Sequence, residues 1–125
     1  MTTEQMNALY EEYKIILERK NDRSKTPENE KSYTKYLFKE GINKILKKIG
    51  EETSELIIAA KDADTGSGAG DRDTPVIEET ADLFYHVLIL LAELGIPLSE
   101  LEAEFEARAA KTGNLKESKS IDKNT

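Results

Sequence analysis

"INKILKKIGEETSELIIAAK", residues Ile42 to Lys61, decides the fold because its apolar residues recur every three or four positions. That spacing places them on one face of an α-helix. Gly50 interrupts this helix at a cost of about 1 kcal/mol relative to alanine. The expected buried stripe consists of Ile42, Ile45, Leu46, Ile49, Thr53, Leu56, Ile57 and Ala60.

Two further helices are expected before this stretch. The first runs from about Glu4 to Lys20, where apolar residues again follow the helical spacing. Ser32 is placed to N-cap a short helix over "YTKYLFKE", and Gly41 is placed to end it. We therefore expect helices and turns, and no strand, in the part of the chain before the long helix.

Two more helices are expected after it. The glycine-rich acidic stretch "DADTGSGAGDRD", residues 62–73, reads as a loop. Thr74 is expected to cap the next helix, which starts at Pro75 and runs to about Leu94. The last helix lies within "PLSELEAEFEARAAK", residues 97–111, with Leu98, Leu101 and Phe105 facing inward.

A chain of 125 residues is long enough for one domain with a real core. We therefore predict an all-α domain over residues 1–112, built as a four- to five-helix bundle. The polar stretch 113–125 is expected to be a disordered tail.

Composition excludes several kinds of function. The formal net charge is −7 and there is no large basic patch, which argues against a nucleic-acid partner. There is no cysteine, and this excludes disulfides, thiolate metal ligands and a cysteine nucleophile. The longest apolar run, residues 87–92, is far too short to span a bilayer, and the N-terminus lacks the apolar segment of a signal peptide. We therefore expect a cytoplasmic protein without a membrane partner.

Three glutamates, Glu51, Glu52 and Glu55, crowd the middle of the long helix. At about 100° per residue, Glu52 and Glu55 lie about 60° apart and flank the apolar stripe, while Glu51 turns toward solvent. A carboxylate at the border of a core is costly unless something cationic lies near it. An isolated pair of this kind is usually a solvated helix face.

The next helix repeats the arrangement in "EETADLFYH", where Glu79 and Asp82 are three residues apart and His86 follows by four. If the two helices pack antiparallel, as a short connection favours, four carboxylates can converge. A cage of oxygens without thiolates suits Mg²⁺, or Mn²⁺ as a substitute, and not zinc. Because Mg²⁺ usually bridges protein carboxylates and substrate phosphates, the residues indicate metal-dependent chemistry on a phosphorylated ligand.

Two other metal sites fit the sequence poorly. A di-iron bundle needs Glu-x-x-His on two helices, and the chain has one histidine at another spacing. The loop places Asp62, Asp64 and Asp73 at EF-hand positions, but glycine is missing from the sixth position and glutamate from the twelfth.

The two acidic motifs also carry a family resemblance. "GEETSE" followed by "EETAD" resembles the E-E-x-x-E and E-x-x-D pattern of the MazG-type all-α nucleoside triphosphate pyrophosphohydrolases. The longer blocks "SYTKYLFKEGINKILKKIGEETSEL" and "EETADLFYHVLILLAELGIPLSEL" resemble the phosphoribosyl-ATP pyrophosphatase family. This resemblance extends over about residues 4 to 111, although the glycine-rich loop looks longer than the family's usual connection.

The resemblance implies Mg²⁺-dependent cleavage of the α–β phosphoanhydride of phosphoribosyl-ATP, the second step of histidine biosynthesis. It also implies a homodimer in which helices of both chains complete the core. The implied metal ligands are Glu52, Glu55, Glu79 and Asp82. Glu51 is implied as a further ligand or as the base that activates water.

Lys48 and His86 have two interpretations each. Lys48 lies on the carboxylate flank, where it can contact a phosphate or form an ion pair with Glu52 or Glu55. His86 shares a face with the second acidic pair. It can hydrogen-bond a ligating carboxylate or the substrate, or it can be a core histidine with its hydrogen bonds satisfied.

Five more residues are candidates for substrate binding. Ser32, Tyr33 and Thr34 precede the long helix, although capping alone explains Ser32. Arg108 and Lys111 are candidate phosphate contacts, and charge at a helix C-terminus is the alternative explanation. Two other function classes stay open: a house-cleaning pyrophosphatase for non-standard or deoxy nucleotides, and a helical interaction module without catalysis.

Overall fold

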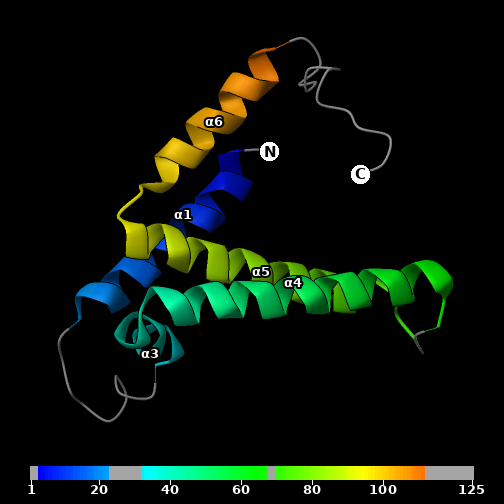
Figure 1. Cartoon of the computed structure of the whole chain (residues 1–125). Coiled ribbons are helices and arrows are strands. Elements are labelled where there is room, and N and C mark those ends of the chain that lie inside the picture. Colours follow the sequence, from blue (N-terminus) through cyan, green and yellow to red (C-terminus); the bar gives the residue numbers. More distant parts are fainter. Residues whose placement is uncertain (1–2, 23–31, 68–69, 112–125) are drawn as a thin grey trace, which may run out of the picture.

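The computed structural model describes residues 3–22, 32–67 and 70–111, and every regular element in these ranges is an α-helix (Figure 1). The helices are α1 (Thr3–Asn21), α3 (Tyr33–Glu40), α4 (Ile42–Thr65), α5 (Asp73–Leu94) and α6 (Leu98–Ala110). The predicted all-α architecture is confirmed, with five helices in the described ranges. The expected tail, residues 113–125, lies outside them, so the domain boundary stays a prediction.

The predicted ends of α3 are confirmed. The Ser32 hydroxyl accepts a hydrogen bond from the Lys35 N–H at 3.3 Å, which is an N-cap contact. Gly41 has a positive φ of 91°, and its N–H donates to the Leu37 carbonyl at 2.9 Å. A residue with a Cβ adopts this φ only with strain, so the glycine lets the chain leave α3 and enter α4 at once.

The α4 helix is longer than the sequence predicts. It continues past Lys61 to Thr65 and ends at Gly66, whose N–H donates to the Asp62 carbonyl at 2.9 Å. Gly66 takes the left-handed conformation, with a φ of 72°, which closes a helix C-terminus. Alanine and aspartate do not break a helix, so α4 continues through the acidic residues. The first glycine of the loop ends it.

The predicted cap of α5 is wrong. The helix begins at Asp73, one residue before Thr74. Asp71 accepts a hydrogen bond from the Asp73 N–H at 2.9 Å, and the Thr74 hydroxyl also donates to Asp71. The aspartate therefore caps the first turn, and Thr74 contributes only through it.

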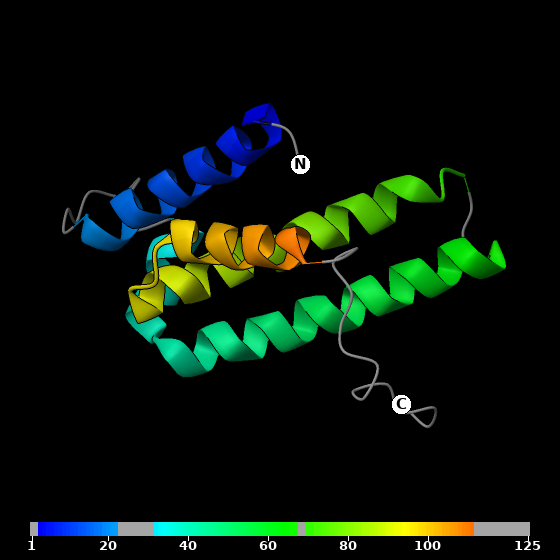
Figure 2. The ribbon, with the colours of Figure 1, turned by 90° about the horizontal axis from the view of Figure 1, so that it is seen from above.

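The α4 and α5 helices lie side by side as a long hairpin (Figures 1 and 2). The α1 helix packs against α5 and α3 at one end of this hairpin, and α3 also packs against α4. The α6 helix leaves α5 at a bend of 115°. Within the described ranges, no single helix has the length and apolar character needed to cross a membrane, and α5 with α6 passes such a test only as this bent pair.

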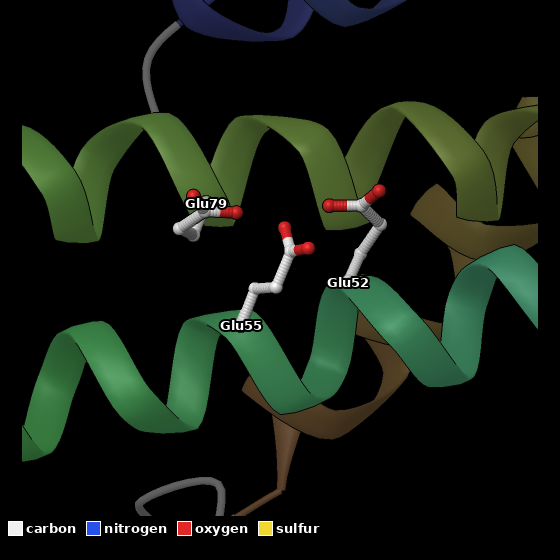
Figure 3. A group of neighbouring side chains, drawn as sticks. All are labelled: Glu52, Glu55 and Glu79. Carbon is white, nitrogen blue, oxygen red and sulfur yellow. The ribbon is translucent and has the colours of Figure 1, made fainter.

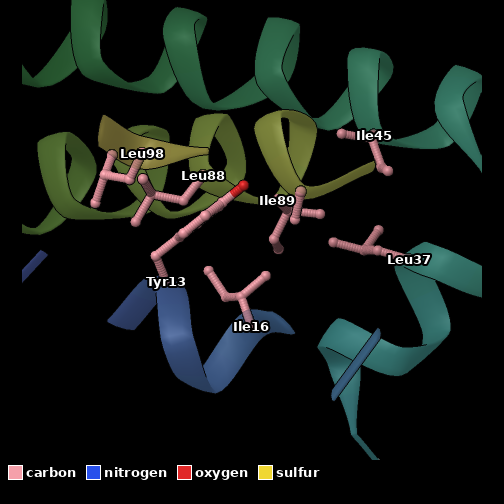
Figure 4. Close-up of a cluster of buried hydrophobic side chains, with 8 residues drawn as sticks. Tyr13, Ile16, Leu37, Ile45, Leu88, Ile89 and Leu98 are labelled. Carbon is pink, nitrogen blue, oxygen red and sulfur yellow. The ribbon is translucent and has the colours of Figure 1, made fainter. Parts of the chain in front are cut away.

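The apolar core lies where α1, α3, the start of α4 and the end of α5 meet (Figure 4). Its fully buried side chains are Ile16, Leu37, Ile45 and Ile89. Two side chains of α1 reach the end of α5: the Tyr13 hydroxyl donates to the Ile96 carbonyl at 2.5 Å, and the Lys20 ammonium donates to the Ala92 carbonyl at 2.6 Å. These contacts hold α1 across the turn that leads to α6.

Four residues predicted to face inward are exposed in this chain: Leu46, Ile57, Ala60 and Phe105. For Ile57, Ala60 and Phe105 the reason is that the α4–α5 hairpin extends beyond the core and α6 extends away from it (Figure 1). Leu46 follows the buried Ile45 at the start of α4 but lies about 100° round the helix from it. Helical period gives the relative direction of side chains on one helix, but it does not say whether another helix covers them. The exposed large apolar side chains of the hairpin include Leu46, Ile57, Ile58, Ile77 and Phe84.

Candidate metal centre

Three carboxylates meet between α4 and α5 (Figure 3). Glu52 and Glu55 lie three residues apart on α4, and Glu79 faces them from α5. Each offers one oxygen, and these oxygens all lie within 4.8 Å of one another. The predicted convergence of the two acidic motifs therefore occurs for three of the four expected ligands.

Burial makes this cluster electrostatically costly. Glu52 is only 7% exposed. Burial, followed by the neighbouring Glu55 carboxylate, raises its pKa above the ordinary value. Burial also raises the pKa of Glu79, followed by Glu55 and then by the charge of Asp82. A bound proton or a bound cation would relieve this cost.

The oxygen atoms of the cluster fit a cation. Among the described residues, Glu52 Oε2 and Glu79 Oε2 are buried and lack a hydrogen-bond partner. Such atoms are rare in proteins because each loses its hydration without compensation. A set of carboxylate oxygens without nitrogen or sulfur is the ligand set of Mg²⁺ or Mn²⁺. Glu52, Glu55 and Glu79 could therefore hold such an ion.

Asp82 lies beside the cluster and not within it. Its side chain is exposed, and it does not belong to the group of oxygens within 4.8 Å. Its charge still contributes to the raised pKa of Glu79, so the two carboxylates are close. Its backbone carbonyl accepts a hydrogen bond from His86 Nδ1 at 2.7 Å.

Lys48 places a positively charged side chain beside the carboxylates. Its ammonium lies 3.0 Å from Glu51 Oε2 and 3.6 Å from Glu52 Oε1. The hydrogen bond from Lys48 is the main reason that the pKa of Glu51 is lowered. Lys48 therefore favours the charged form of Glu51, whereas burial and Glu55 disfavour the charged form of Glu52. The predicted ion pair of Lys48 with Glu52 is present, with Glu51 as a second and closer partner.

His86 is buried and has a partner on each ring nitrogen. The Asp82 carbonyl can only accept, so Nδ1 carries the hydrogen. In the neutral imidazole, Nε2 then accepts from the Tyr33 hydroxyl at 2.7 Å. This hydrogen bond ties α3 to α5 directly beside the carboxylates. Both ring nitrogens have a hydrogen-bond partner, as expected for a buried core histidine. The ring also lies next to the carboxylate cluster.

Thr34 and Tyr85 make a second link between α3 and α5. The Thr34 side chain is buried, and its hydroxyl hydrogen-bonds the Tyr85 hydroxyl. Tyr85 is not among the site residues predicted from the sequence, although it directly precedes His86. Ser32 caps α3, as described above, and this contact accounts for its hydroxyl.

Arg108 and Lys111 are not brought to the cluster. Arg108 pairs with Glu104 on its own helix at 3.2 Å, and both side chains are exposed. Lys111 lies at the end of α6, where its N–H donates to the Arg108 carbonyl at 3.2 Å. The α6 helix leads away from the middle of α4 and α5 (Figure 1).

Comparison with known proteins shows what the whole chain is similar to. A family model described as phosphoribosyl-ATP pyrophosphohydrolase matches residues 11–109. A phosphoribosyl-ATP pyrophosphatase of Listeria monocytogenes serotype 4b is 43% identical over 116 residues, which is 93% of this chain and 96% of the relative. The Streptococcus thermophilus protein of that name is 41% identical over 109 residues (87% and 92%), and the Clostridium novyi protein is 39% identical over 111 residues (89% of each).

Proposed function

The chain belongs to the phosphoribosyl-ATP pyrophosphohydrolase family, and we therefore propose that it hydrolyses phosphoribosyl-ATP in the second step of histidine biosynthesis. Water cleaves the α–β phosphoanhydride, and the products are phosphoribosyl-AMP and pyrophosphate. The observation that carries the proposal is the cluster of Glu52, Glu55 and Glu79, whose oxygens lie within 4.8 Å of one another. Carboxylates this close fit a divalent cation that also binds phosphate, and two of them have buried oxygens without a partner in the described part of the chain.

The proposed cofactor is Mg²⁺, with Mn²⁺ as a substitute. Glu52, Glu55 and Glu79 would hold it, and Asp82 is the fourth predicted ligand at the edge of the cluster. A bound divalent ion neutralises phosphate oxygens and can lower the pKa of a bound water.

Glu51 and Lys48 have complementary roles in this proposal. The Glu51 carboxylate is the proposed acceptor for the proton of the attacking water, and the hydrogen bond from Lys48 keeps it in its charged form. The Lys48 ammonium, 3.0 Å from that carboxylate, can donate to a phosphate oxygen on the same flank. Phosphoryl transfer depends mainly on such positioning and charge stabilisation.

Tyr33 and His86 position the α3 side of the site through the hydrogen bond between them. Thr34 supports the same arrangement through Tyr85. The roles of Ser32, Arg108 and Lys111 in substrate binding stay predictions from the sequence.

We also propose that the chain is a homodimer. The face of the α4–α5 hairpin formed by Leu46, Ile57, Ile58, Ile77 and Phe84 is exposed in one chain. Exposed large apolar side chains that gather on two packed helices are typical of a protein interface. A second copy of the hairpin would complete the core, as the family resemblance implies. The cytoplasmic location and the absence of nucleic-acid and membrane partners remain predictions.

A substrate panel tests the proposed reaction. Pyrophosphate release is measured with phosphoribosyl-ATP and with deoxy and non-standard nucleoside triphosphates, in Mg²⁺ and in a chelator. We expect phosphoribosyl-ATP to give the highest kcat/KM and the chelator to abolish turnover. A preference for another triphosphate would support the house-cleaning alternative. Glu79→Gln should be inactive, whereas Glu78→Gln, on the exposed neighbour in α5, should keep its activity.

A further inference from the structure

Two tyrosines of α3 form an exposed aromatic pair. Tyr33 and Tyr36 are 42% and 44% exposed, although large rings are usually more buried. Residues three apart lie on one face of a helix, and these rings stack with their centroids 6.4 Å apart and an interplanar angle of 29°. The pair therefore presents an aromatic surface to solvent at the corner between α3 and α4.

This surface is continuous with the carboxylate site. The Tyr33 hydroxyl donates to His86 Nε2 at 2.7 Å, and this contact fixes the ring. Burial raises the pKa of that hydroxyl, the Lys48 charge lowers it, and Glu52 and Glu51 raise it further. Tyr33 therefore lies within the electrostatic reach of the residues proposed to bind the metal and the phosphates.

Lysines of α4 lie next to both features. The Lys44 ammonium lies over the Tyr36 ring, 5.9 Å from its centroid. Lys48, one turn further along α4, lies 3.0 Å from Glu51 Oε2 and 3.6 Å from Glu52 Oε1. The aromatic pair, the lysines and the carboxylates therefore follow one another from α3 to the middle of α4.

We infer that Tyr36 and Tyr33, with Lys44 beside them, form the subsite for the purine base of the nucleotide substrate. This inference rests on the proposed function, because it takes the carboxylates and Lys48 as the phosphate end of the site. A nucleotide carries its base at one end and its anionic phosphates at the other, which matches the order of aromatic and charged groups. Every base has a π-face that stacks on an exposed aromatic ring.

The test compares Tyr36→Ala with Tyr36→Phe in steady-state kinetics with phosphoribosyl-ATP. Loss of stacking should raise KM by about 5- to 100-fold, while phenylalanine should keep the wild-type KM. The kcat should not change, because a stacked base is bound equally in the ground state and the transition state. Lys44→Ala should raise KM by about 2- to 5-fold. Phe105→Ala, an exposed aromatic on α6, is the matched control and should change nothing.

Equilibrium binding separates this inference from the proposed reaction. In calorimetry with Mg²⁺, Tyr36→Ala should weaken the binding of ATP and leave inorganic triphosphate, which has no base, unaffected. If the wild type hydrolyses phosphoribosyl-ATP but the variant keeps its KM and its ATP affinity, the base subsite is wrong and the reaction stands. If the wild type does not hydrolyse it, the reaction is wrong, and the ATP titration still decides the subsite. A lower kcat at unchanged KM, or an altered sedimentation coefficient, would also overturn the assignment.

Discussion

Replacing Glu52 with glutamine should change stability in opposite directions with and without Mg²⁺. Glu52 is buried, its pKa is raised, and its Oε2 has no partner among the described residues. Glutamine has the same shape, and its amide can donate a hydrogen bond to a neighbouring carboxylate. The substitution therefore removes a charge that Lys48 compensates only in part, while it keeps the packing.

The size of the expected stability change follows from the distances between Glu52 and the neighbouring charged groups. A unit charge on Glu52, at most 4.8 Å from its two neighbours, is repelled by each with about 1 kcal/mol in water and about 3.5 kcal/mol at an effective dielectric constant of about 20. The repulsion of about 1 kcal/mol applies better, because Glu55 is exposed and water screens its charge. The attraction to Lys48 at 3.6 Å, which is lost too, offsets about one of these repulsions. We therefore expect the variant to be more stable in a chelator by about 1 kcal/mol, or about 4 °C in Tm.

Thermal unfolding at pH 7, in EDTA and in saturating Mg²⁺, measures both effects. A ligand at 100 times its Kd stabilises the folded state by about 2.7 kcal/mol, and the variant with a weakened site should gain much less. Wild type should therefore be the less stable protein in EDTA and the more stable one in Mg²⁺. Glu78→Gln removes the same charge from an exposed position and should respond to Mg²⁺ as wild type does. The reasoning is refuted if the Glu52→Gln variant and the wild type gain equally from Mg²⁺, or if the variant is the less stable one in EDTA.

The remaining predictions concern pH, the core and the exposed face. Because folding raises the pKa of Glu52 and Glu79, their stabilising contribution is full below about pH 4.5 and is lost as the pH rises through the raised values. Melts between pH 5 and 7 should therefore show a Mg²⁺-induced gain in Tm that grows with pH, and a constant gain would contradict the pKa shifts. Tyr13→Phe removes the hydrogen bond to the Ile96 carbonyl, and urea unfolding should show a loss of about 1 kcal/mol. Ile57→Glu should sediment as a 14.0 kDa monomer with an unchanged fold, because this side chain is 63% exposed in one chain. A wild-type protein that already sediments as a monomer at micromolar concentration would rule out the homodimer.

Local sequence features account for the secondary structure. Ser32 has a hydroxyl that caps α3, and Gly41 and Gly95 have the positive φ that ends a helix. These effects depend on neighbouring residues only, so they can be predicted without the fold. The two places where prediction failed are also local: α4 continues to Thr65, and Asp71 caps α5 in place of Thr74.

The acidic motifs were also visible in the sequence, because three-residue spacing places Glu52 and Glu55 on one side of a helix whatever surrounds it. Which carboxylates meet is a different question. Packing between α4 and α5 sets their register, and it brings Glu79 against Glu55 while Asp82 stays at the edge. The spacing of residues within one helix does not determine the register between two helices.

The helices, the candidate ligands and the family can therefore be read from the order of residues alone. Packing in three dimensions settles which of those groups share a site and which apolar residues are covered. Lys48 pairs with Glu51 and Glu52, Tyr33 reaches His86 from α3, and Leu46 and Ile57 stay exposed in one chain. The physical reason is that helical period fixes directions about one axis, whereas contacts between distant segments depend on how the helices pack together.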